Sequence, residues 1–226
     1  MTSVVLQGSG NPVSVPKIIC VGRNYAEHAK EMKADLPSSP ILFFKPPSAL
    51  IPSGGTIVRP SISKELHHEV EVTVLLGKGG KAIPEQSAME HIAGYGVGLD
   101  MTLRDVQSVA KKGGLPWALA KGFDTSAPVS EFIPAAAVSN PHRLMIELRV
   151  NGNIRQKGTT SDFIFTLPRL ISYISQFFTL TAGDIIFTGT PEGIAETVPG
   201  DTLEASLSEP GKPPLTSLKV RVEAGG

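Results

Sequence analysis

Short segments of alternating apolar and polar residues, separated by glycine and proline, constrain the fold of this chain more than any other feature. Residues 67–76 read HHEVEVTVLL, with a valine at every second position from 70 to 74, and they end at GKGG. β-Branched residues spaced in this way favour a strand. Strand-like segments also occur at 17–22, 41–45, 184–189 and 218–222. With 23 glycines and 19 prolines among 226 residues, they predict a β-rich domain with many turns.

The other segments predict one hairpin and a few short helices. Asn151-Gly152 joins two alternating runs within 143–160, which is a strong hairpin signal. The glycines of the strand-like segment GYGVGLDMT (94–102) predict either close backbone approach or a bulge. Helices are expected at 24–34, 85–92, 103–112 and 166–178; the third opens with a possible capping box, Thr102 to Asp105, and the last is amphipathic. We therefore expect an α+β, mostly β fold, with an N-terminal arm at 1–16 and a single catalytic domain at 17–226.

Charge and hydropathy exclude several classes of partner. Lys and Arg total 21 and Asp and Glu total 21, so the formal net charge is zero, and we expect no nucleic-acid partner. No apolar run approaches the roughly 18 residues of a membrane span. The first 16 residues have no basic segment followed by an apolar one, and Cys20 is the single cysteine, within the apolar run IICV. These observations predict a cytoplasmic protein with a buried, unreactive thiol.

Two carboxylates share one face of the strand at 67–76. Glu69 and Glu71 are two residues apart, so their side chains point to the same side at a spacing of roughly 7 Å. One interpretation is a solvated strand face, polar outward and valine inward. The other is a divalent cation held by both carboxylates, because two like charges so placed repel one another unless a positive charge lies between them.

Asp100 could complete such a cation site. It lies at the end of the strand-like segment, just before the helix expected at 103–112, where functional side chains commonly gather. Three carboxylates with water suit Mg²⁺ or Mn²⁺, which prefer oxygen ligands. Zinc is disfavoured, because His67 and His68 are adjacent on a strand and point to opposite faces.

His28 and Glu31 are three residues apart on the first expected helix, within GRNYAEHAKEM, so they share one face. They are either a surface ion pair or a general base whose imidazole is oriented by a carboxylate. Further polar and cationic residues lie beside turn residues. Together these residues indicate a site for an anionic substrate chelated to a metal. They are Arg23, Lys45, Arg104, Gln107, Lys121 and Thr190.

Six segments in this order resemble the fumarylacetoacetate hydrolase family: GRNYAEHAKEM, ILFFKPPSALIPSG, HHEVEVTVLLG, GYGVGLDMTLRDVQ, LPWALAKGFDTSAPVS and DIIFTGTPEGI. The likeness is greatest to its short members, the acylpyruvate hydrolase (acylpyruvase) and oxaloacetate decarboxylase group, and it covers about residues 17–223. It implies a rolled, mixed β-sheet, as in the family's C-terminal domain, and a homodimer.

The resemblance also implies roles for individual residues. Mg²⁺ or Mn²⁺ would be held by Glu69, Glu71 and Asp100. His28 and Glu31 would form a catalytic pair on a lid helix, and Lys121 would be the active-site lysine. Substrate would contact the remaining polar residues, which are Arg23, Lys45, Arg104, Gln107 and Thr190.

The activity implied by the resemblance is metal-dependent hydrolysis of a C–C bond in 3-acylpyruvates, such as acetylpyruvate or fumarylpyruvate, giving pyruvate and a carboxylic acid. The alternatives are oxaloacetate decarboxylation, oxaloacetate keto–enol tautomerisation, and isomerase or decarboxylase steps in aromatic-ring catabolism. A non-catalytic dicarboxylate-binding protein is less consistent with the residues, because binding alone does not require a positioned base at His28.

Overall fold

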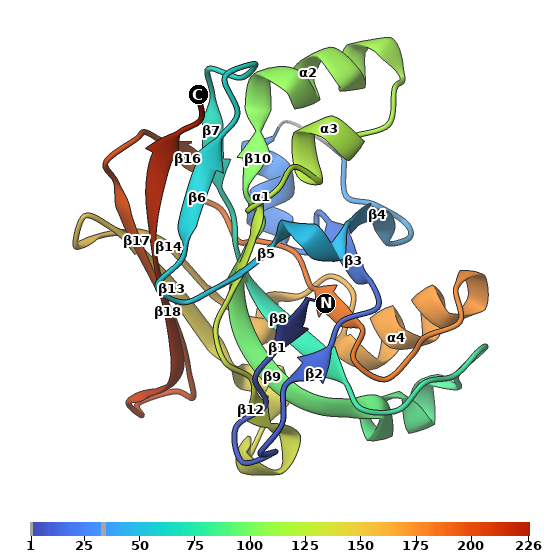
Figure 1. The fold of residues 1–226 in the computed structure, drawn as a ribbon. Coiled ribbons are helices and arrows are strands. Elements are labelled where there is room, and N and C mark those ends of the chain that lie inside the picture. Colours follow the sequence, from blue (N-terminus) through green and yellow to red (C-terminus); the bar gives the residue numbers. More distant parts are fainter. Residues whose placement is uncertain (1, 33–34) are drawn as a thin grey trace.

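The computed structural model describes residues 2–32 and 35–226, and a curved eight-stranded sheet runs through its centre (Figure 1). In order across this sheet lie β4 (Ile41–Lys45), β3 (Ile18–Gly22), β15 (Ile185–Phe187), β8 (Val70–Leu76), β9 (Ile92–Leu99), β11 (Ala127–Val129) and β5 (Leu50–Pro52), with β12 (Ile133–Pro134) paired to β9. The pairs β3–β15 and β5–β11 are parallel, and the other pairs are antiparallel. This is the rolled, mixed sheet that the sequence predicted.

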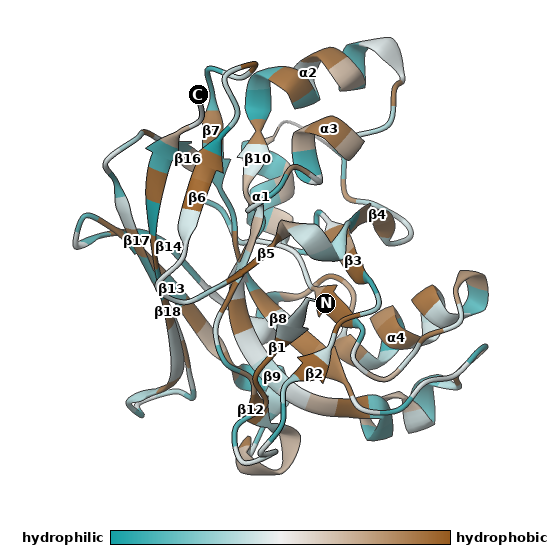
Figure 2. Cartoon of the chain, in the orientation of Figure 1, coloured by the Kyte–Doolittle hydropathy of each residue, from teal (hydrophilic) through white to brown (hydrophobic). Residues whose placement is uncertain are grey.

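A second, five-stranded sheet covers one side of β8 and β9. Its strands, in order, are β14 (Asn153–Thr159), β13 (Met145–Val150), β17 (Thr202–Ser208), β18 (Pro214–Ala224) and β6 (Thr56–Arg59). Buried and exposed residues alternate along β17 and β18, so one face of the sheet packs on the core and the other meets solvent (Figure 2). The predicted hairpin is confirmed: β13 and β14 pair across Asn151 and Gly152, both with positive φ.

Strand β8 is buried on both faces, and this excludes a solvated strand face around Glu71. Its partner β9 fits closely because it is rich in glycine. A Cβ on Gly94 would lie 2.5 Å from the carbonyl oxygen of Ile133, and one on Gly98 would lie 2.8 Å from the Phe187 ring. The predicted close backbone approach is therefore confirmed.

Two small sheets flank the centre. One contains β10 (Thr102–Leu103), β7 (Leu66–His68) and β16 (Ala195–Thr197), and the other contains β1 (Ser3–Val4) and β2 (Val13–Ser14). The predicted arm is thus a hairpin, and it packs on the domain: Val4 and Val15 are buried in the same hydrophobic cluster as Cys20. Burial raises the pKa of the Cys20 thiol, as expected for an unreactive cysteine.

Four α-helices lie outside the sheets: α1 (Ala26–Glu31), α2 (Arg104–Gly113), α3 (Ala118–Lys121) and α4 (Leu167–Phe177). The amphipathic helix α4 is confirmed, with its apolar stripe buried. The helix expected at 24–34 is shorter, and residues 33 and 34 of that prediction lie outside the described part. Single 3₁₀ turns form η1 (Pro47–Ala49), η3 (Ala135–Ala137), η4 (Pro141–Arg143) and η5 (Thr160–Asp162), and the helix expected at 85–92 is a longer 3₁₀ segment, η2 (Glu85–His91). Among the described residues, no helix is long and apolar enough to cross a membrane.

The predicted capping box at the start of α2 is wrong. The N-cap residue is Leu103, and no side chain caps the helix. Thr102 pairs within β10, and its hydroxyl donates to the carbonyl of Asp100 at 3.1 Å. The Asp105 carboxylate instead accepts hydrogen bonds from Ser63 Oγ (2.6 Å) and the Lys64 amide (2.9 Å). Tertiary contacts therefore replace the local cap.

Candidate active site

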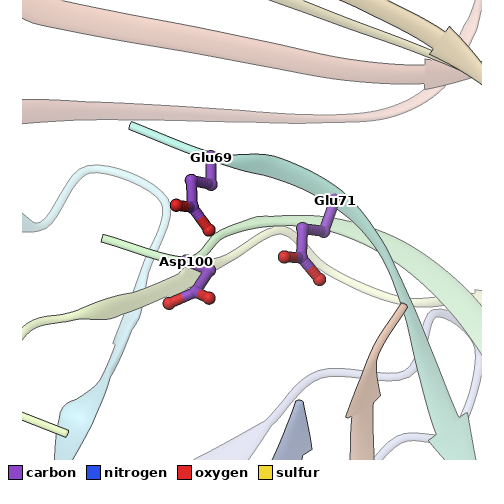
Figure 3. Close-up of side chains that lie close together, drawn as sticks. All are labelled: Glu69, Glu71 and Asp100. Carbon is purple, nitrogen blue, oxygen red and sulfur yellow. The ribbon is translucent and has the colours of Figure 1, made fainter. Parts of the chain in front are cut away.

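Three buried carboxylates meet where β8 and β9 end. Glu69 lies between β7 and β8, Glu71 lies in β8, and Asp100 follows β9. The antiparallel register places Val70 opposite Leu99, and the Asp100 amide donates to the Glu69 carbonyl at 2.8 Å, so Asp100 is held beside Glu69. One oxygen from each carboxylate lies within 4.8 Å of the others, and the three groups point toward one another (Figure 3).

Cations surround this carboxylate cluster of Glu69, Glu71 and Asp100. The ammonium of Lys121 lies 2.7 Å from Glu69 Oε2 and 2.6 Å from Asp100 Oδ2. The Arg104 guanidinium donates to Glu69 Oε1 at 2.5 Å and to Gln107 Oε1 at 2.6 Å. These pairs keep the charges of Glu69 and Lys121 compensated in a buried environment.

The protonation behaviour of the cluster is asymmetric. Burial, and then the charges of Asp100 and Glu69, raise the pKa of Glu71 well above its ordinary value, although the Gly189 amide donates to it at 2.7 Å. Burial alone would also raise the pKa of Glu69, but Lys121 and Arg104 outweigh it and lower that pKa. For Lys121, the attraction of Asp100 and Glu69 outweighs burial and raises the pKa. Glu71 is therefore the carboxylate that most lacks a positive neighbour.

The donor set fits a divalent cation. All three ligands are carboxylate oxygens, which Mg²⁺ and Mn²⁺ prefer. Asp100 Oδ1 is buried and makes no hydrogen bond among the described residues, although Lys45 Nζ lies 2.8 Å away as an ion-pair partner. A cation shared by the cluster would satisfy this oxygen and lower the cost of ionised Glu71.

His28 lines the same cavity as the carboxylate cluster, and Glu31 is its hydrogen-bond partner. His28 is 6% exposed, and its Nδ1 lies 3.1 Å from Glu31 Oε2. The other oxygen of Glu31 accepts from the Gly193 amide at 3.0 Å. Because a carboxylate can only accept, Nδ1 carries the proton in this pair, and the lone pair of a neutral imidazole is on Nε2. The pair is therefore a partly buried, oriented imidazole and not a surface ion pair.

A single cavity contains all predicted site residues except Glu31 and Lys45. Its lining includes Arg23, His28, Glu69, Glu71, Asp100, Arg104, Gln107, Lys121 and Thr190, together with Val21, Gly22, Met32, Phe43, Lys111 and Trp117. Glu31 lies behind His28. The cavity thus brings together residues from α1, β3, β8, α2, α3 and the loop after β15.

The comparison with protein families now identifies the chain. The family model described as fumarylacetoacetate (FAA) hydrolase C-terminal matches residues 17–223. The chain belongs to this family. Among fumarylacetoacetate hydrolase family relatives, the mitochondrial oxaloacetate tautomerase of Rattus norvegicus is 48% identical over 206 residues, which is 91% of each chain. The corresponding protein of Arabidopsis thaliana is 49% identical over 192 residues, covering 85% of this chain and 86% of that one.

Solved structures of the family share the fold. A fumarylpyruvate hydrolase from Pseudomonas aeruginosa, crystallised with Mn²⁺ and pyruvate, superposes with a TM-score of 0.90 at 39% identity and covers 99% of this chain and 96% of its own. A 5-carboxymethyl-2-hydroxymuconate delta-isomerase from Mycobacterium smegmatis gives a TM-score of 0.82 at 35% identity, covering 95% and 81%. The fold therefore accommodates several keto-acid reactions.

Lys45 corrects one expectation for this family member. Its ammonium lies behind Asp100, fully buried and outside the cavity, where it pairs with Asp100 Oδ1 and donates to Ser126 Oγ (3.0 Å) and to the carbonyls of Met101 and Lys121. The sequence suggested a substrate contact because FFKPP places a lysine beside a turn. The strand β4 instead turns this side chain into the protein, where it holds Asp100 in place.

Gln156 and Lys111 are two residues that the sequence analysis missed. Gln156, on β14, is buried, and its Oε1 accepts from the Val70 amide at 3.0 Å, between the two glutamates. Its Nε2 donates to Thr190 Oγ1 and to the Pro191 carbonyl, both at 2.9 Å. Nothing in the alternating run IRQKG marks this glutamine. Lys111 lies in the last turn of α2, where a positive charge also complements the helix dipole, so its place in the sequence does not mark it as a cavity residue.

Proposed function

We propose that this chain is a divalent-metal-dependent enzyme acting on small 2-keto acids through their enol forms, with keto–enol tautomerisation of oxaloacetate as its main reaction. The observation that carries the proposal is that a buried carboxylate cluster and an oriented imidazole face one cavity. Such an arrangement supplies an electron sink and a base, which are what tautomerisation requires. The likeness to oxaloacetate tautomerases over nine-tenths of both chains supports this choice of reaction.

Glu69, Glu71 and Asp100 would hold Mg²⁺ or Mn²⁺. When bound, such a cation supplies Lewis acidity toward the keto and carboxylate oxygens of the substrate. Lys45 and the Glu69 carbonyl position Asp100, and the Gly189 amide positions Glu71. These contacts come from backbone and buried side chains, so the ligands are preorganised.

His28 would move the proton. Its Nε2 takes a proton from C3 of oxaloacetate, which is the carbon between the keto group and the second carboxylate. Glu31 keeps the imidazole in the required tautomer and stabilises the imidazolium that forms. The proton held by the His28 imidazolium then passes to the C2 oxygen, which completes the keto-to-enol exchange and regenerates the neutral imidazole, and the reverse sequence returns the keto form.

The remaining polar residues would bind and compensate charge. The Lys121 ammonium lies beside the carboxylate cluster, where it can balance negative charge that develops on the substrate oxygen. Arg104, Gln107, Thr190 and Arg23 line the same cavity and offer donors to substrate oxygens. Their arrangement suits a small, anionic keto acid.

Hydrolysis of 3-acylpyruvates is the second candidate, and the sequence analysis ranked it first. The His28–Glu31 pair favours it, because a base of this kind can activate water. The likeness to a fumarylpyruvate hydrolase also supports it. The hydrolase class stays a prediction, since the Rattus norvegicus and Arabidopsis thaliana relatives, 48% and 49% identical, are named as oxaloacetate tautomerases.

Turnover measurements on the purified protein test the proposal. Ketonisation of enol oxaloacetate, followed by its ultraviolet absorbance, is compared with hydrolysis of acetylpyruvate and fumarylpyruvate, each with Mg²⁺, with Mn²⁺ and with EDTA. We expect the highest kcat/KM on oxaloacetate and loss of activity in EDTA. A higher kcat/KM on an acylpyruvate would favour hydrolysis, and full activity in EDTA would contradict the metal dependence that both reactions share.

We also propose a homodimer and a cytoplasmic location. The homodimer follows from the family resemblance and is tested by light scattering coupled to size exclusion. Several relatives are named as mitochondrial, so cell fractionation is the test for the compartment.

A further inference from the structure

Two cations on the cavity wall, Arg23 and Lys111, form no ion pair within the described residues 2–32 and 35–226. Lys45, Lys121 and Arg104 each form an ion pair with the carboxylate cluster. Arg23 and Lys111 line the same cavity, yet neither lies within 4.0 Å of a carboxylate among the described residues. Unpaired cations grouped around a cavity indicate a place for an anion.

The backbone at Arg23 is strained in order to place this residue. Arg23 has φ of 60°, a left-handed conformation that side-chain-bearing residues rarely adopt. The neighbouring Asn24 fixes it: its Nδ2 donates to the carbonyls of Thr188 (2.8 Å) and Phe165 (3.1 Å), and its Oδ1 accepts from the Phe165 amide (2.7 Å). Strain that buried hydrogen bonds maintain at a cavity wall is typical of functional positions.

Lys111 reaches the cavity from the last turn of α2. Its Nζ lies 5.3 Å from the centre of the Trp117 ring, a cation–π contact that orients the side chain. Partial burial, and then the positive charges of Arg104 and Arg23, lower the pKa of Lys111. Three cations that repel one another around the cavity would be stabilised by an anion between them.

The charge balance of the site indicates how many anionic groups the ligand carries. Three carboxylates in the cluster are compensated by Lys45, Lys121 and Arg104. A divalent cation would then leave a surplus of two positive charges, before Arg23 and Lys111 are counted. Arg23 and Lys111 raise this surplus to four, so a ligand with two carboxylates compensates more of it than a ligand with one.

We propose that Lys111, together with Arg23, binds the second carboxylate of the substrate and makes the enzyme select 2-keto dicarboxylic acids over monocarboxylic ones. The inference rests on the proposed function, because the first carboxylate and the keto group are assigned to the metal side of the cavity. It adds the residue that distinguishes oxaloacetate from a keto acid of equal length that ends in a methyl group.

The test compares oxaloacetate with 2-oxobutyrate, its four-carbon monocarboxylic counterpart. Deuterium exchange at C3, followed by NMR, is measured for both compounds in wild type, Lys111→Met, Lys111→Arg and the neighbouring control Lys112→Met. Losing one charge-assisted hydrogen bond should raise KM for oxaloacetate about tenfold in Lys111→Met. The change for 2-oxobutyrate should be much smaller, Lys111→Arg should restore the oxaloacetate KM, and Lys112→Met should match wild type. Equal changes for the two compounds, or none, would overturn the proposal.

A binding measurement separates this inference from the proposed function. Calorimetry on the Mn²⁺-loaded protein compares 2-oxoglutarate, a dicarboxylic probe, with 2-oxobutyrate, and needs no turnover. If wild type fails to tautomerise oxaloacetate but still prefers the dicarboxylate, and Lys111→Met loses that preference, the carboxylate site stands and the reaction is wrong. If the preference is absent in wild type or unchanged in Lys111→Met, the carboxylate site is wrong.

Discussion

The two walls of the cavity are built differently. The carboxylate wall is formed by Glu69, Glu71 and Asp100, held by strand pairing, two backbone amides, two buried lysines and the partly buried Arg104. The histidine wall is α1, a six-residue helix without a side-chain N-cap, fixed to the loop after β15 by the Gly193 amide on Glu31. A helix this short is not stable alone. The carboxylate wall is thus a rigid part of the core, and the histidine wall depends on few contacts.

We therefore expect metal binding and proton transfer to be separable in this protein. Changes to the carboxylate wall should affect metal affinity first, and changes to the histidine wall should affect turnover with the metal still bound. Five substitutions test this separation and are given in decreasing order of effect.

Replacing Glu71 by Gln should give the largest effect. Removing a direct ligand should weaken Mn²⁺ binding by more than the 10–100-fold that is typical of outer-shell changes, and turnover should be lost. Calorimetry with Mn²⁺ measures the affinity. The variant keeps an acceptor for the Gly189 amide and removes a buried charge, so the metal-free protein should melt no lower than wild type. A large fall in Tm would instead mean that the fold had been damaged.

Replacing His28 by Ala should lower turnover by about 10²–10⁴-fold, the usual loss for a general base. The Mn²⁺ affinity should stay at the wild-type value, because no described contact joins His28 to a carboxylate of the cluster. A Kd for Mn²⁺ that weakens along with activity would show that the two walls are coupled.

Replacing Gln156 by Leu should weaken Mn²⁺ binding by about 10–100-fold. The side-chain oxygen of Gln156 accepts a hydrogen bond from the backbone amide of Val70, which lies between the two glutamates, and its side-chain nitrogen donates to Thr190 Oγ1. Ser175→Ala is the matched control. Ser175 lies on α4, is as buried as Gln156, and its hydroxyl accepts a hydrogen bond from the Ile83 amide. It does not line the cavity. If both variants lose stability but neither loses metal affinity, Gln156 serves the fold alone.

Replacing Gly193 by Ala should reduce kcat about tenfold, a loss of roughly 1.4 kcal/mol in transition-state stabilisation, without weakening Mn²⁺ binding. Gly193 has φ of 92°, and an added Cβ would lie 2.4 Å from the Arg155 carbonyl, so the amide that Glu31 accepts must move. Gly200→Ala is the control, since Gly200 has φ of 100° but no atom within 4 Å of the added Cβ. Equal kcat losses in both variants would mean that backbone strain, and not the Glu31 contact, is responsible.

Replacing Lys30 by Ala should have the smallest effect. Lys30 lies on α1 beside His28, but its partner Glu27, at 2.5 Å, is exposed, and such surface pairs contribute little. Neither Tm nor kcat/KM should change measurably. A clear loss of kcat with an unchanged Tm would show that the charge on the outer face of α1 controls the position of the histidine wall.

From the sequence alone one can predict the strands, the hairpin at Asn151-Gly152, the helix α4 and the carboxylates that could hold a cation. These signals are local: a period of two defines the faces of a strand, a period of 3.6 defines those of a helix, and a Glu-x-Glu spacing puts two carboxylates on one side. The spacing between His28 and Glu31 is local in the same sense, and the pair forms as predicted.

The tertiary structure decided which partners these side chains have. Asp100 reaches Glu69 because β8 and β9 pair in one register, and Asp105 is drawn from a helix cap to Ser63. Gln156 meets Val70 across 86 residues. An alternating sequence pattern specifies which face of a strand a residue is on, but not which strand or loop packs against that face. The sequence also does not show whether a polar side chain in a strand forms its hydrogen bonds with water or with a backbone amide. The roles of Lys45, Lys111 and Gln156 therefore arise only when the sheets close around the cavity.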